Sequence, residues 1–436
     1  MDTSLFSGFY RKTYSERIDL LQQAELIQPE EATQLKEGTL TLPSEVAEHM
    51  VENHFSVYSL PMGIAFHFLI DGKQIAVPMA TEEPSVIAAV NYAAKIIQQS
   101  EGFQTSLSSR RMIGQVALKR IPNMKQAKER ILAARNLLLQ TANEAHPSIV
   151  KRGGGARELE VRFIKEEPSE GTPAFLVVHF FVDTLEAMGA NIVNTMMEAV
   201  VPLLEELSDG TALMGILSNY ATECLATASC RIKPRYLRSG ALTGEEVRDR
   251  IIEASQFAWA DPYRATTNNK GIFNGIDAVV LASGNDWRAI EAGGHAYAAQ
   301  SGQYRSLSKW SKDSEGFLTG ELTLPLPVGT VGGSIGIHPH AQLAREIMGD
   351  PDALELESII ISVGLAQNLA ALKALVTEGI QRGHMSLQAK SLALAAGATE
   401  SEVFEVTEKL KQVPHRNLEA VKNILKDLRK TTEEPQ

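Results

Sequence analysis

Residues 174–182 have the sequence AFLVVHFFV, a run of β-branched and aromatic residues that predicts a β-strand. The chain around it alternates further strand-like runs with helical ones, at residues 114–119, 158–164, 124–142 and 191–207. Strands and helices interleaved in this order indicate a small α+β domain of the split βαβ type. We therefore expect an inserted small domain at residues 112–219.

The chain on either side of this insert is predicted to be mainly helical. A β-hairpin is expected at residues 66–77, because Asp71-Gly72 supplies a turn. Pro84 is suited to open a helix that runs to about Gln99. Apolar periodicity predicts one more strand at residues 320–326 and further helices at residues 14–28, 44–51, 219–229, 244–259, 286–300 and 354–376.

This pattern predicts an α/β (α+β) protein with three parts. Residues 1–111 and 220–377 form a large, mainly helical domain, in which residues 1–60 suit a scaffold or subunit contact. Residues 112–219 form the small insert, and residues 378–436 form a C-terminal helical segment with Gly379 and Gly383 as a candidate hinge. A chain of 436 residues exceeds what one hydrophobic core organises, which also favours several domains.

The composition is that of an ordinary globular protein, with 44% hydrophobic and 22% charged residues. The apolar segment at residues 192–204 is interrupted by Asn194, Glu198 and Pro202, so no membrane span is predicted. The first residues lack the basic flank and apolar core of a secretory signal. The chain has only two cysteines, which fits a reducing compartment, and we expect a cytoplasmic protein.

The net charge of −11 excludes nucleic acid as a general partner, because binding to polyphosphate needs a basic surface. A metal site is not predicted either. The histidines His295, His338 and His340 have no metal-binding spacing to carboxylates, and Cys224 and Cys230 have no histidine nearby.

Glycine-rich turns are candidate phosphate-binding sites. A Rossmann GxGxxG pattern is absent, since the nearest sequence, VGGSIG at residues 331–336, lacks the first glycine. Two other turns remain: the glycines at 153–155, preceded by Lys151 and Arg152, and the turn at 188–191, where Asn191 is a candidate N-cap. Free N–H groups at a helix start can bind pyrophosphate. The alternative is that both are simple turns.

Several polar residues are candidates for chemistry. Glu83 precedes Pro84 at the start of a helix, where it either complements the helix dipole or projects into a cleft. The polar stretch at residues 261–275 contains Arg264, which suits a substrate carboxylate, and Lys270, which suits an oxyanion. An exposed loop with solvated charges is the alternative for this stretch.

Asp286 and His384 complete the set of candidates. Asp286 precedes an apolar helix and acts either as its cap or as a partner of Lys270. His384 follows the glycine hinge and exchanges a proton near neutral pH, which suits an acid on a mobile segment. A surface histidine is its alternative interpretation.

Together these motifs resemble the bacterial, soluble class II of 3-hydroxy-3-methylglutaryl-CoA reductases. The resemblance extends from about residue 6 to the tail and is carried by EEPS at 82–85, EAMGAN at 186–191, residues 261–274, GNDWRA at 284–289 and GIQRGHM at 379–385. It implies that the large domain binds substrate and forms the subunit contact, that the small domain binds the nicotinamide dinucleotide, and that residues 378–436 are a flap that closes over the active site. It also implies a homodimer with sites at the subunit interface. Higher oligomers stay open.

The resemblance also implies roles for individual residues. Lys270 holds the substrate oxygen, Asp286 adjusts the charge of Lys270, Glu83 protonates the aldehyde intermediate, and His384 protonates the CoA thiolate. Substrate-binding positions are Ser85, Arg264 and Asn274, and cofactor-binding positions are Glu186, Met188, Gly189, Ala190 and Asn191. The chain departs from the family at Ser56, where a glycine is usual, and at Asn268, where a histidine is usual.

The implied reaction is the four-electron reduction of the CoA thioester to mevalonate and free CoA, through a hemithioacetal and mevaldehyde. Lys151 and Arg152 suit a 2′-phosphate and favour NADPH, with NADH as the alternative. A non-redox CoA-ester lyase or acyl transferase, a binding protein without activity, and use in the mevalonate-oxidising direction are the competing hypotheses. Isoprenoid biosynthesis by the mevalonate pathway is the expected use.

Overall fold

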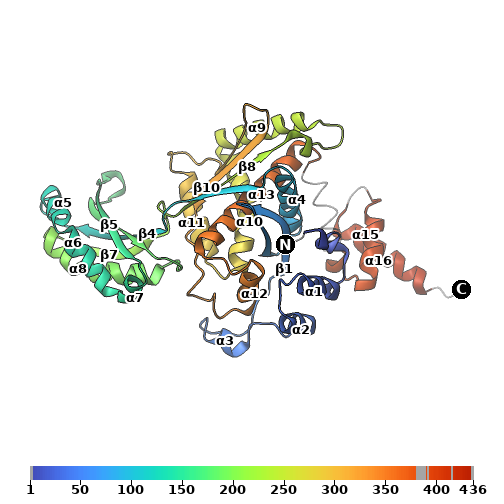
Figure 1. Ribbon diagram of the computed structural model, residues 1–436, viewed down its shortest axis with the longest axis horizontal. Coiled ribbons are helices and arrows are strands. Elements are labelled where there is room, and N and C mark those ends of the chain that lie inside the picture. The colour runs from blue at the N-terminus through green and yellow to red at the C-terminus, as the bar shows by residue number, and fades with distance from the viewer. Residues whose placement is uncertain (1–2, 380–388, 390–391, 414–415, 434–436) are drawn as a thin grey trace.

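The computed structural model describes residues 3–379, 389, 392–413 and 416–433. Its strands form two separate sheets, one of six strands and one of four. Each sheet has its own hydrophobic core, and Figure 1 shows the four-stranded unit at one end of the molecule and the C-terminal helices at the other.

The six-stranded sheet has the order β2-β1-β3-β8-β10-β9. Its strands are β1 (Met62–Ile70), β2 (Lys73–Ala80), β3 (Phe103–Leu107), β8 (Leu225–Ile232), β9 (Ser308–Lys312) and β10 (Leu318–Pro325). The predicted hairpin is confirmed, since β1 and β2 pair antiparallel. Asp71 and Gly72 form its turn with φ of 47° and 80°, a region that asparagine-like residues and glycine tolerate.

One prediction for this large unit is wrong. Residues 219–229 were expected to be helical, but β8 starts at Leu225, and Ala226, Ala228, Cys230 and Ile232 alternate into the core. Alanine is common in helices, so the composition of this segment favoured a helix. Its buried residues nevertheless recur at every second position, which is the period of a strand. Helices still span more residues of this unit than strands do, as expected, but the size of the sheet at its centre was not predicted.

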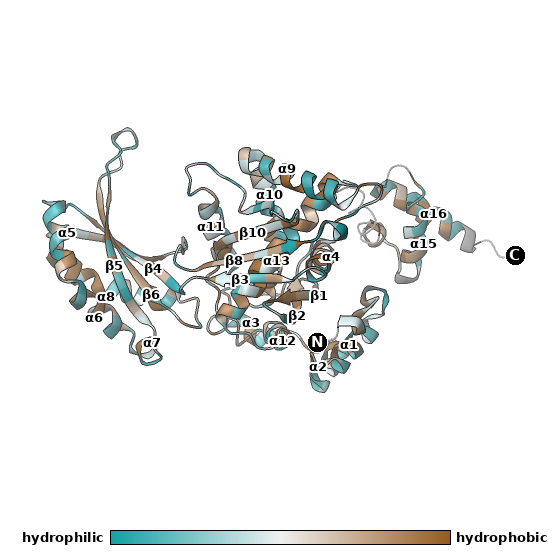
Figure 2. Ribbon diagram, turned by 45° about the horizontal axis from the view of Figure 1, so that its top comes forward, coloured by the Kyte–Doolittle hydropathy of each residue, from teal (hydrophilic) through white to brown (hydrophobic). Residues whose placement is uncertain are grey.

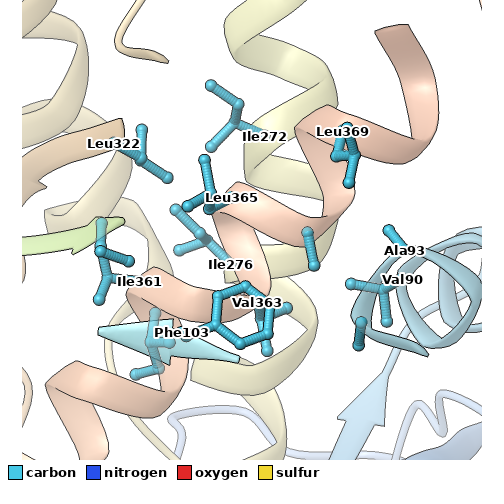
Figure 3. Packing of buried hydrophobic residues seen from close by; sticks show 14 of the residues in the cluster. Val90, Ala93, Phe103, Ile272, Ile276, Leu322, Ile361, Val363, Leu365 and Leu369 are labelled. Carbon is cyan, nitrogen blue, oxygen red and sulfur yellow. The ribbon is translucent and has the colours of Figure 1, made fainter. Parts of the chain in front are cut away.

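Helix α13 (Ala353–Val376) is the centre of this unit and is buried along most of its length. Figure 3 shows it surrounded by side chains such as Val90 and Ala93 of α4, Ile272 and Ile276 of α10, and Phe103 of β3. The other helices of this unit are α4 (Val86–Gln98), α9 (Gly244–Ala260), α10 (Pro262–Ala282), α11 (Trp287–Ala298) and α12 (Pro339–Ile347), with a 3-10 turn at Pro234–Tyr236.

Within the described residues, α13 is the one helix long and apolar enough to cross a membrane by length and composition. This helix is longer than the apolar segment at residues 192–204. Because 72% of its most apolar window is buried inside the protein, its apolar surface is already covered. In Figure 2 the apolar colour gathers on the central elements, while the outer helices α1 and α2 mix polar and apolar residues.

The N-terminal segment packs on the outer side of β1. It contains two 3-10 turns, Thr3–Phe6 and Phe9–Arg11, followed by α1 (Tyr14–Gln23), α2 (Pro29–Glu37) and α3 (Ser44–Glu48). Thr13 and Glu16 form a capping box that starts α1. Phe6 stacks on Phe66 of β1 with ring centroids 3.9 Å apart, which fixes this segment to the sheet.

The four-stranded unit has the order β5-β6-β4-β7, and all its pairs are antiparallel. In chain order its elements are β4 (Arg111–Lys119), α5 (Met124–Ala133), α6 (Arg135–Ala145), α7 (Pro147–Lys151), β5 (Gly155–Ile164), a 3-10 turn (Pro168–Glu170), β6 (Phe175–Asp183), α8 (Ala190–Ser208) and β7 (Thr211–Ser218). The predicted helix at 124–142 is divided at Ala134, and β7 was not predicted.

The C-terminal helices α15 (Glu400–Leu410) and α16 (Leu418–Glu433) pack together through Val406, Leu410, Val421 and Leu425. They belong to the predicted flap. Gly379 has a positive φ of 81°, which suits the proposed hinge position. The second hinge glycine, Gly383, and His384 lie outside the described residues.

The packing of α13 gives a stability prediction. Leu365 is fully buried, so Leu365→Ala removes apolar contacts and leaves a cavity, at a cost of about 2–5 kcal/mol. Leu375 lies on the same helix but is 43% exposed, so Leu375→Ala should change stability by less than about 1 kcal/mol. Urea unfolding followed by tryptophan fluorescence measures both, and equal losses in the two variants would contradict the central role of α13.

Candidate active site

Glu83 and Lys270 form an ion pair, with Glu83 Oε2 2.9 Å from Lys270 Nζ. Glu83 lies in the turn between β2 and α4, and Lys270 projects from the middle of α10. The two side chains are 32% and 61% exposed, so water screens the pair and it contributes little to stability. A carboxyl group beside an ammonium group, open to solvent, is an arrangement that can transfer a proton to a carbonyl oxygen and hold its charge.

The predicted substrate-binding residues lie on the two segments that carry this pair. Ser85 precedes α4 in a left-handed conformation, with φ of 78°, which is uncommon for serine and marks a constrained turn beside Glu83. Asn274 follows Lys270 by one helical turn and shares its face of α10. Arg264 lies in the first turn of α10, where partial burial lowers the pKa of its guanidinium.

The polar stretch at 261–275 is helical, so the alternative of an exposed loop is wrong. Asp261 caps α10 by accepting a hydrogen bond from Arg264 N at 3.1 Å, and Pro262 occupies the first helical position. Helix α10 has a polar face toward solvent and an apolar face toward α13, which explains why polar and apolar residues alternate in its sequence.

Asn268, where the family usually has a histidine, is buried and makes a structural network. Its side-chain amide donates to Ser306 Oγ at 2.9 Å and its carbonyl accepts from Asn368 Nδ2 at 3.0 Å. Asn368 in turn accepts from Trp310 Nε1 at 2.7 Å. This asparagine therefore connects α10 to α13 and points away from the neighbouring Lys270.

Asp286 caps α11 and lies far from Lys270 of the same chain. Its carboxylate accepts hydrogen bonds from the backbone N–H groups of Arg288 and Ala289, at 3.1 and 3.2 Å. Helices α10 and α11 run antiparallel, because Phe273 packs on His295 while Asp277 contacts Glu291. At 1.5 Å per residue, Asp286 is then roughly 18 Å from Lys270 along the helix axes.

Asp286 lies instead beside residues 186–191, which are the predicted cofactor-binding segment and are called the dinucleotide loop below. The neighbouring Asn285 accepts a hydrogen bond from Gly329 N at 2.7 Å and donates to Gly329 O at 3.0 Å. A Cβ added to Gly329 would meet Met188 N at 2.7 Å, so the two segments are in close contact. One chain thus carries two groups of candidate residues at separate places: Glu83, Ser85, Lys270 and Asn274 in one, and Asp286 with residues 186–191 in the other.

The dinucleotide loop leads into the first turn of α8. Gly189, with φ of 93°, is the N-cap, so the expectation that Asn191 is the cap is wrong. Ala190 and Asn191 form the first helical turn instead. A Cβ on Gly189 would meet Thr184 Cγ2 at 2.3 Å, which leaves room only for glycine. The open N–H groups of this turn and the helix dipole suit an anion.

Glu186 is held within the protein. Its carboxylate accepts from Thr330 Oγ1 at 2.7 Å and from Ala353 N, at the start of α13, at 2.9 Å. The glycine turn at 153–155 lies beside the same loop, because Gly155 pairs with Asp183 at the end of β6. Lys151 and Arg152, just before this turn, are exposed.

Asp277 and Glu291 form a carboxyl pair that the sequence analysis missed. Asp277 follows Lys270 by two turns of α10, and burial together with the charge of Glu291 raises its pKa to about 8. Asp277 Oδ1 is buried without a donor among the described groups, which a proton shared with Glu291 would satisfy. An isolated aspartate within the apolar run IDAVVLA was the available sequence signal.

This pair makes stability depend on pH. The ordinary pKa of 3.8 applies in the unfolded chain and a value of about 8 in the folded chain, so the folded state binds more protons between these values. The contribution of this carboxyl pair to the free energy of unfolding is complete below about pH 4 and is lost as pH rises through about 8.

Asp277→Asn should therefore flatten the decline of melting temperature between about pH 5 and pH 8 relative to the unmodified chain. Thermal unfolding at each pH measures this. Glu198→Gln, at an exposed position of α8, is the control and should leave the decline unchanged. Parallel profiles for Asp277→Asn and the unmodified chain would show that the pair does not share a proton.

Comparison with known proteins identifies the family. The family model of hydroxymethylglutaryl-coenzyme A reductase matches residues 13–389. A 3-hydroxy-3-methylglutaryl-coenzyme A reductase of Archaeoglobus fulgidus is 42% identical, over 98% of this chain and 95% of its own length. A probable enzyme of the same name from Borreliella burgdorferi is 36% identical, over 79% of this chain and 77% of its own.

Solved structures agree with the sequence matches. A 3-hydroxy-3-methylglutaryl-coenzyme A reductase from Streptococcus pneumoniae has a TM-score of 0.83 and 54% identity, covering 97% of this chain and 99% of its own. A second structure, the class II enzyme of the same organism bound to NADPH in open conformations, has a TM-score of 0.81 and 54% identity, covering 96% and 100%. The chain therefore belongs to the hydroxymethylglutaryl-coenzyme A reductase family.

Proposed function

We propose that this protein reduces 3-hydroxy-3-methylglutaryl-CoA to mevalonate and free CoA, in the mevalonate pathway of isoprenoid biosynthesis. The observation that carries the proposal is the Glu83–Lys270 pair, 2.9 Å apart in a chain of this family. We also propose that the protein is cytoplasmic. The large domain comprises residues 1–111 and 220–377, the small split βαβ domain residues 112–219, and the flap residues 378–436.

Each residue of the site has a chemical task. Lys270 donates hydrogen bonds to the carbonyl oxygen and stabilises the negative charge that develops there at each reduction. Glu83, in contact with Lys270, supplies the proton that this oxygen needs when the aldehyde becomes an alcohol. The CoA thiol, with a pKa of about 8.5, leaves more readily when protonated, and His384 on the flap is the proposed donor.

Ser85, Arg264 and Asn274 are the proposed substrate contacts. Arg264 suits the free carboxylate of the acyl group, because a guanidinium binds a carboxylate with two parallel hydrogen bonds. Asn274 shares the Lys270 face of α10 and can orient the acyl group toward the lysine.

NADPH is the proposed cofactor, and when bound it supplies the hydride for each of the two reductions. The start of α8 fits its pyrophosphate, since Gly189 leaves no space for a Cβ and the first-turn N–H groups are open. Met188, Gly189, Ala190 and Asn191 form this cradle, and Glu186 holds the loop on the large domain. Lys151 and Arg152 lie at the adjacent turn and suit a 2′-phosphate, with NADH as the alternative.

A homodimer is proposed because one chain cannot bring its two groups of residues together. The roughly 18 Å between Lys270 and Asp286 exceeds the reach of a lysine side chain. Phe55 and Tyr58, in an extended segment before β1, are 96% and 88% exposed and suit burial against a second subunit. Asp286 and the dinucleotide loop of one subunit would then complete the Glu83–Lys270 site of the other.

A lyase or acyl transferase is less well supported by the structure. Burial raises the pKa of the Cys224 thiol to about 11 and that of Cys230 to about 12, so both are protonated and poor nucleophiles. Among the described residues, no group of histidines, cysteines and carboxylates could hold a metal ion.

The reductase proposal predicts a stoichiometry. Mixing the protein with the CoA ester and NADPH should oxidise two NADPH for each CoA released, measured by absorbance and by thiol titration. Lys270→Ala should lower kcat by at least about 10²-fold. Lys73 makes a similar exposed pair with Glu355, at 2.6 Å, and Lys73→Ala is the control that should keep its activity. A ratio of one, or an active Lys270→Ala protein, would remove the proposal.

Shared sites predict complementation between two inactive variants. A mixed dimer of Lys270→Ala and Asp286→Asn chains has one site with both defects and one site with neither. Unfolding and refolding the two variants together should therefore restore activity toward about a quarter of that of the unmodified protein. If both groups acted within one chain, every site would carry a defect and the mixture would stay inactive.

A further inference from the structure

Arg110 makes a dense set of contacts that the proposed chemistry does not use. Its guanidinium pairs with the carboxylate of Glu357, and the two side chains are only 8% and 1% exposed. The same guanidinium donates to Leu185 O at 2.8 Å, to Ala187 O at 3.3 Å and to Val328 O at 2.5 Å. One side chain thus contacts the carboxylate of α13 and three backbone carbonyls from two other segments.

Arg110 is located where the chain passes between the two cores. β4 begins at the next residue, Arg111, and the returning segment lies alongside, since Ser108 N donates to Leu225 O at 2.9 Å. Cys224 on that segment donates through its Sγ to Glu357 Oε1 at 3.4 Å. The chain passes from the large unit to the small one at Arg110 and returns at Cys224. Both segments, and the dinucleotide loop as well, therefore meet at the Arg110–Glu357 pair.

The energetics favour a geometric role for this pair. Removing two charges from water costs several kcal/mol for each ion, and their attraction roughly offsets that cost only when the remaining donors are bonded. Here the three backbone carbonyl oxygens accept hydrogen bonds from the remaining N–H groups of the Arg110 guanidinium. An apolar pair of similar volume would stabilise a core at least as well, whereas a planar guanidinium fixes the directions of several carbonyls at once.

The contacts hold the loop from two sides. Arg110 binds the carbonyls of Leu185 and Ala187, and the intervening Glu186 is bonded to Thr330 and to the first turn of α13. Gly189, the N-cap of α8, follows two residues after Ala187. The position of the α8 N–H groups relative to the large domain is thus set by this junction.

We propose that Arg110 and Glu357 are positioning residues that hold the dinucleotide loop on α13, so that their loss weakens NADPH binding while substrate binding at Glu83 and Lys270 is preserved. This inference rests on the proposed function, because it assigns the loop to the cofactor. Neither residue contacts the reacting groups. Their effect is transmitted through the backbone of residues 185–189.

Arg110→Lys tests the proposal. Lysine keeps the charge opposite Glu357 but cannot bond three carbonyls in the same plane. The dissociation constant for NADPH, measured by fluorescence titration of the full-length protein, should rise at least about 10-fold, and the KM for the CoA ester should stay within about twofold. Glu357→Gln, which keeps the shape of the side chain, should shift NADPH binding in the same direction.

Arg248→Lys is the matched control. The side chain of Arg248 is 10% exposed, pairs with Asp249 at 2.7 Å and donates to the carbonyl of Gly316 at 2.6 Å, but Arg248 belongs to α9. Its replacement should lower the melting temperature and leave NADPH affinity unchanged.

The outcomes separate this inference from the proposed function. If Arg110→Lys and Glu357→Gln bind NADPH like the unmodified protein, or if both ligands weaken equally, the positioning role is overturned. If the unmodified protein itself does not bind NADPH, the proposed function fails first. Should Arg110→Lys not fold, Glu357→Gln alone decides between these results.

Discussion

Helix α13 has no polar face, and the large unit is arranged to cover it. Strands β3, β8 and β10 and helices α4 and α10 supply apolar side chains to it, and Figure 3 shows how closely they surround it. This burial constrains the position of α10, and with it the direction in which Lys270 projects. Two buried polar residues of α13 bond to other elements: Asn368 bonds to Asn268 and Trp310, and Glu357 bonds to Arg110. The central helix therefore anchors the proposed substrate site and the junction with the small unit.

The separation of the two groups of candidate residues follows from how α10 and α11 are connected. α11 turns back along α10, so its cap, Asp286, is carried away from Lys270 and toward the dinucleotide loop. Each group is built on rigid elements that share the same core. In the proposed homodimer a second copy of the chain completes a site that needs both groups, and the strongly exposed Phe55 and Tyr58 before β1 suit that contact.

The sequence predicted much of the fold, and the misses have physical reasons. The Asp71-Gly72 hairpin and α8 were found because a turn residue or a helical period is a local signal. β8 was taken for a helix because alanine gives little contrast between the two periods. The pairing of Glu83 with Lys270 was accessible only through the family resemblance, since 187 residues separate them. The distance of Asp286 from Lys270 and the buried Arg110–Glu357 pair depend on tertiary packing, which leaves no trace in local composition. For the carboxyl pair, the sequence shows only an aspartate in an apolar run, and its partner Glu291 is set by packing.

The late position of α13 in the chain has a consequence for synthesis on the ribosome. The small unit closes its own core between β4 and β7, well before α13 is made. The six-stranded sheet, in contrast, has its last strand by residue 325, yet the helix that covers it ends only at Val376. A nascent chain must therefore keep an apolar sheet surface exposed to solvent while its final segments emerge, which is the situation in which chaperones bind. Chains that terminate before α13 would lack the cover of the sheet, and cellular proteases would remove them.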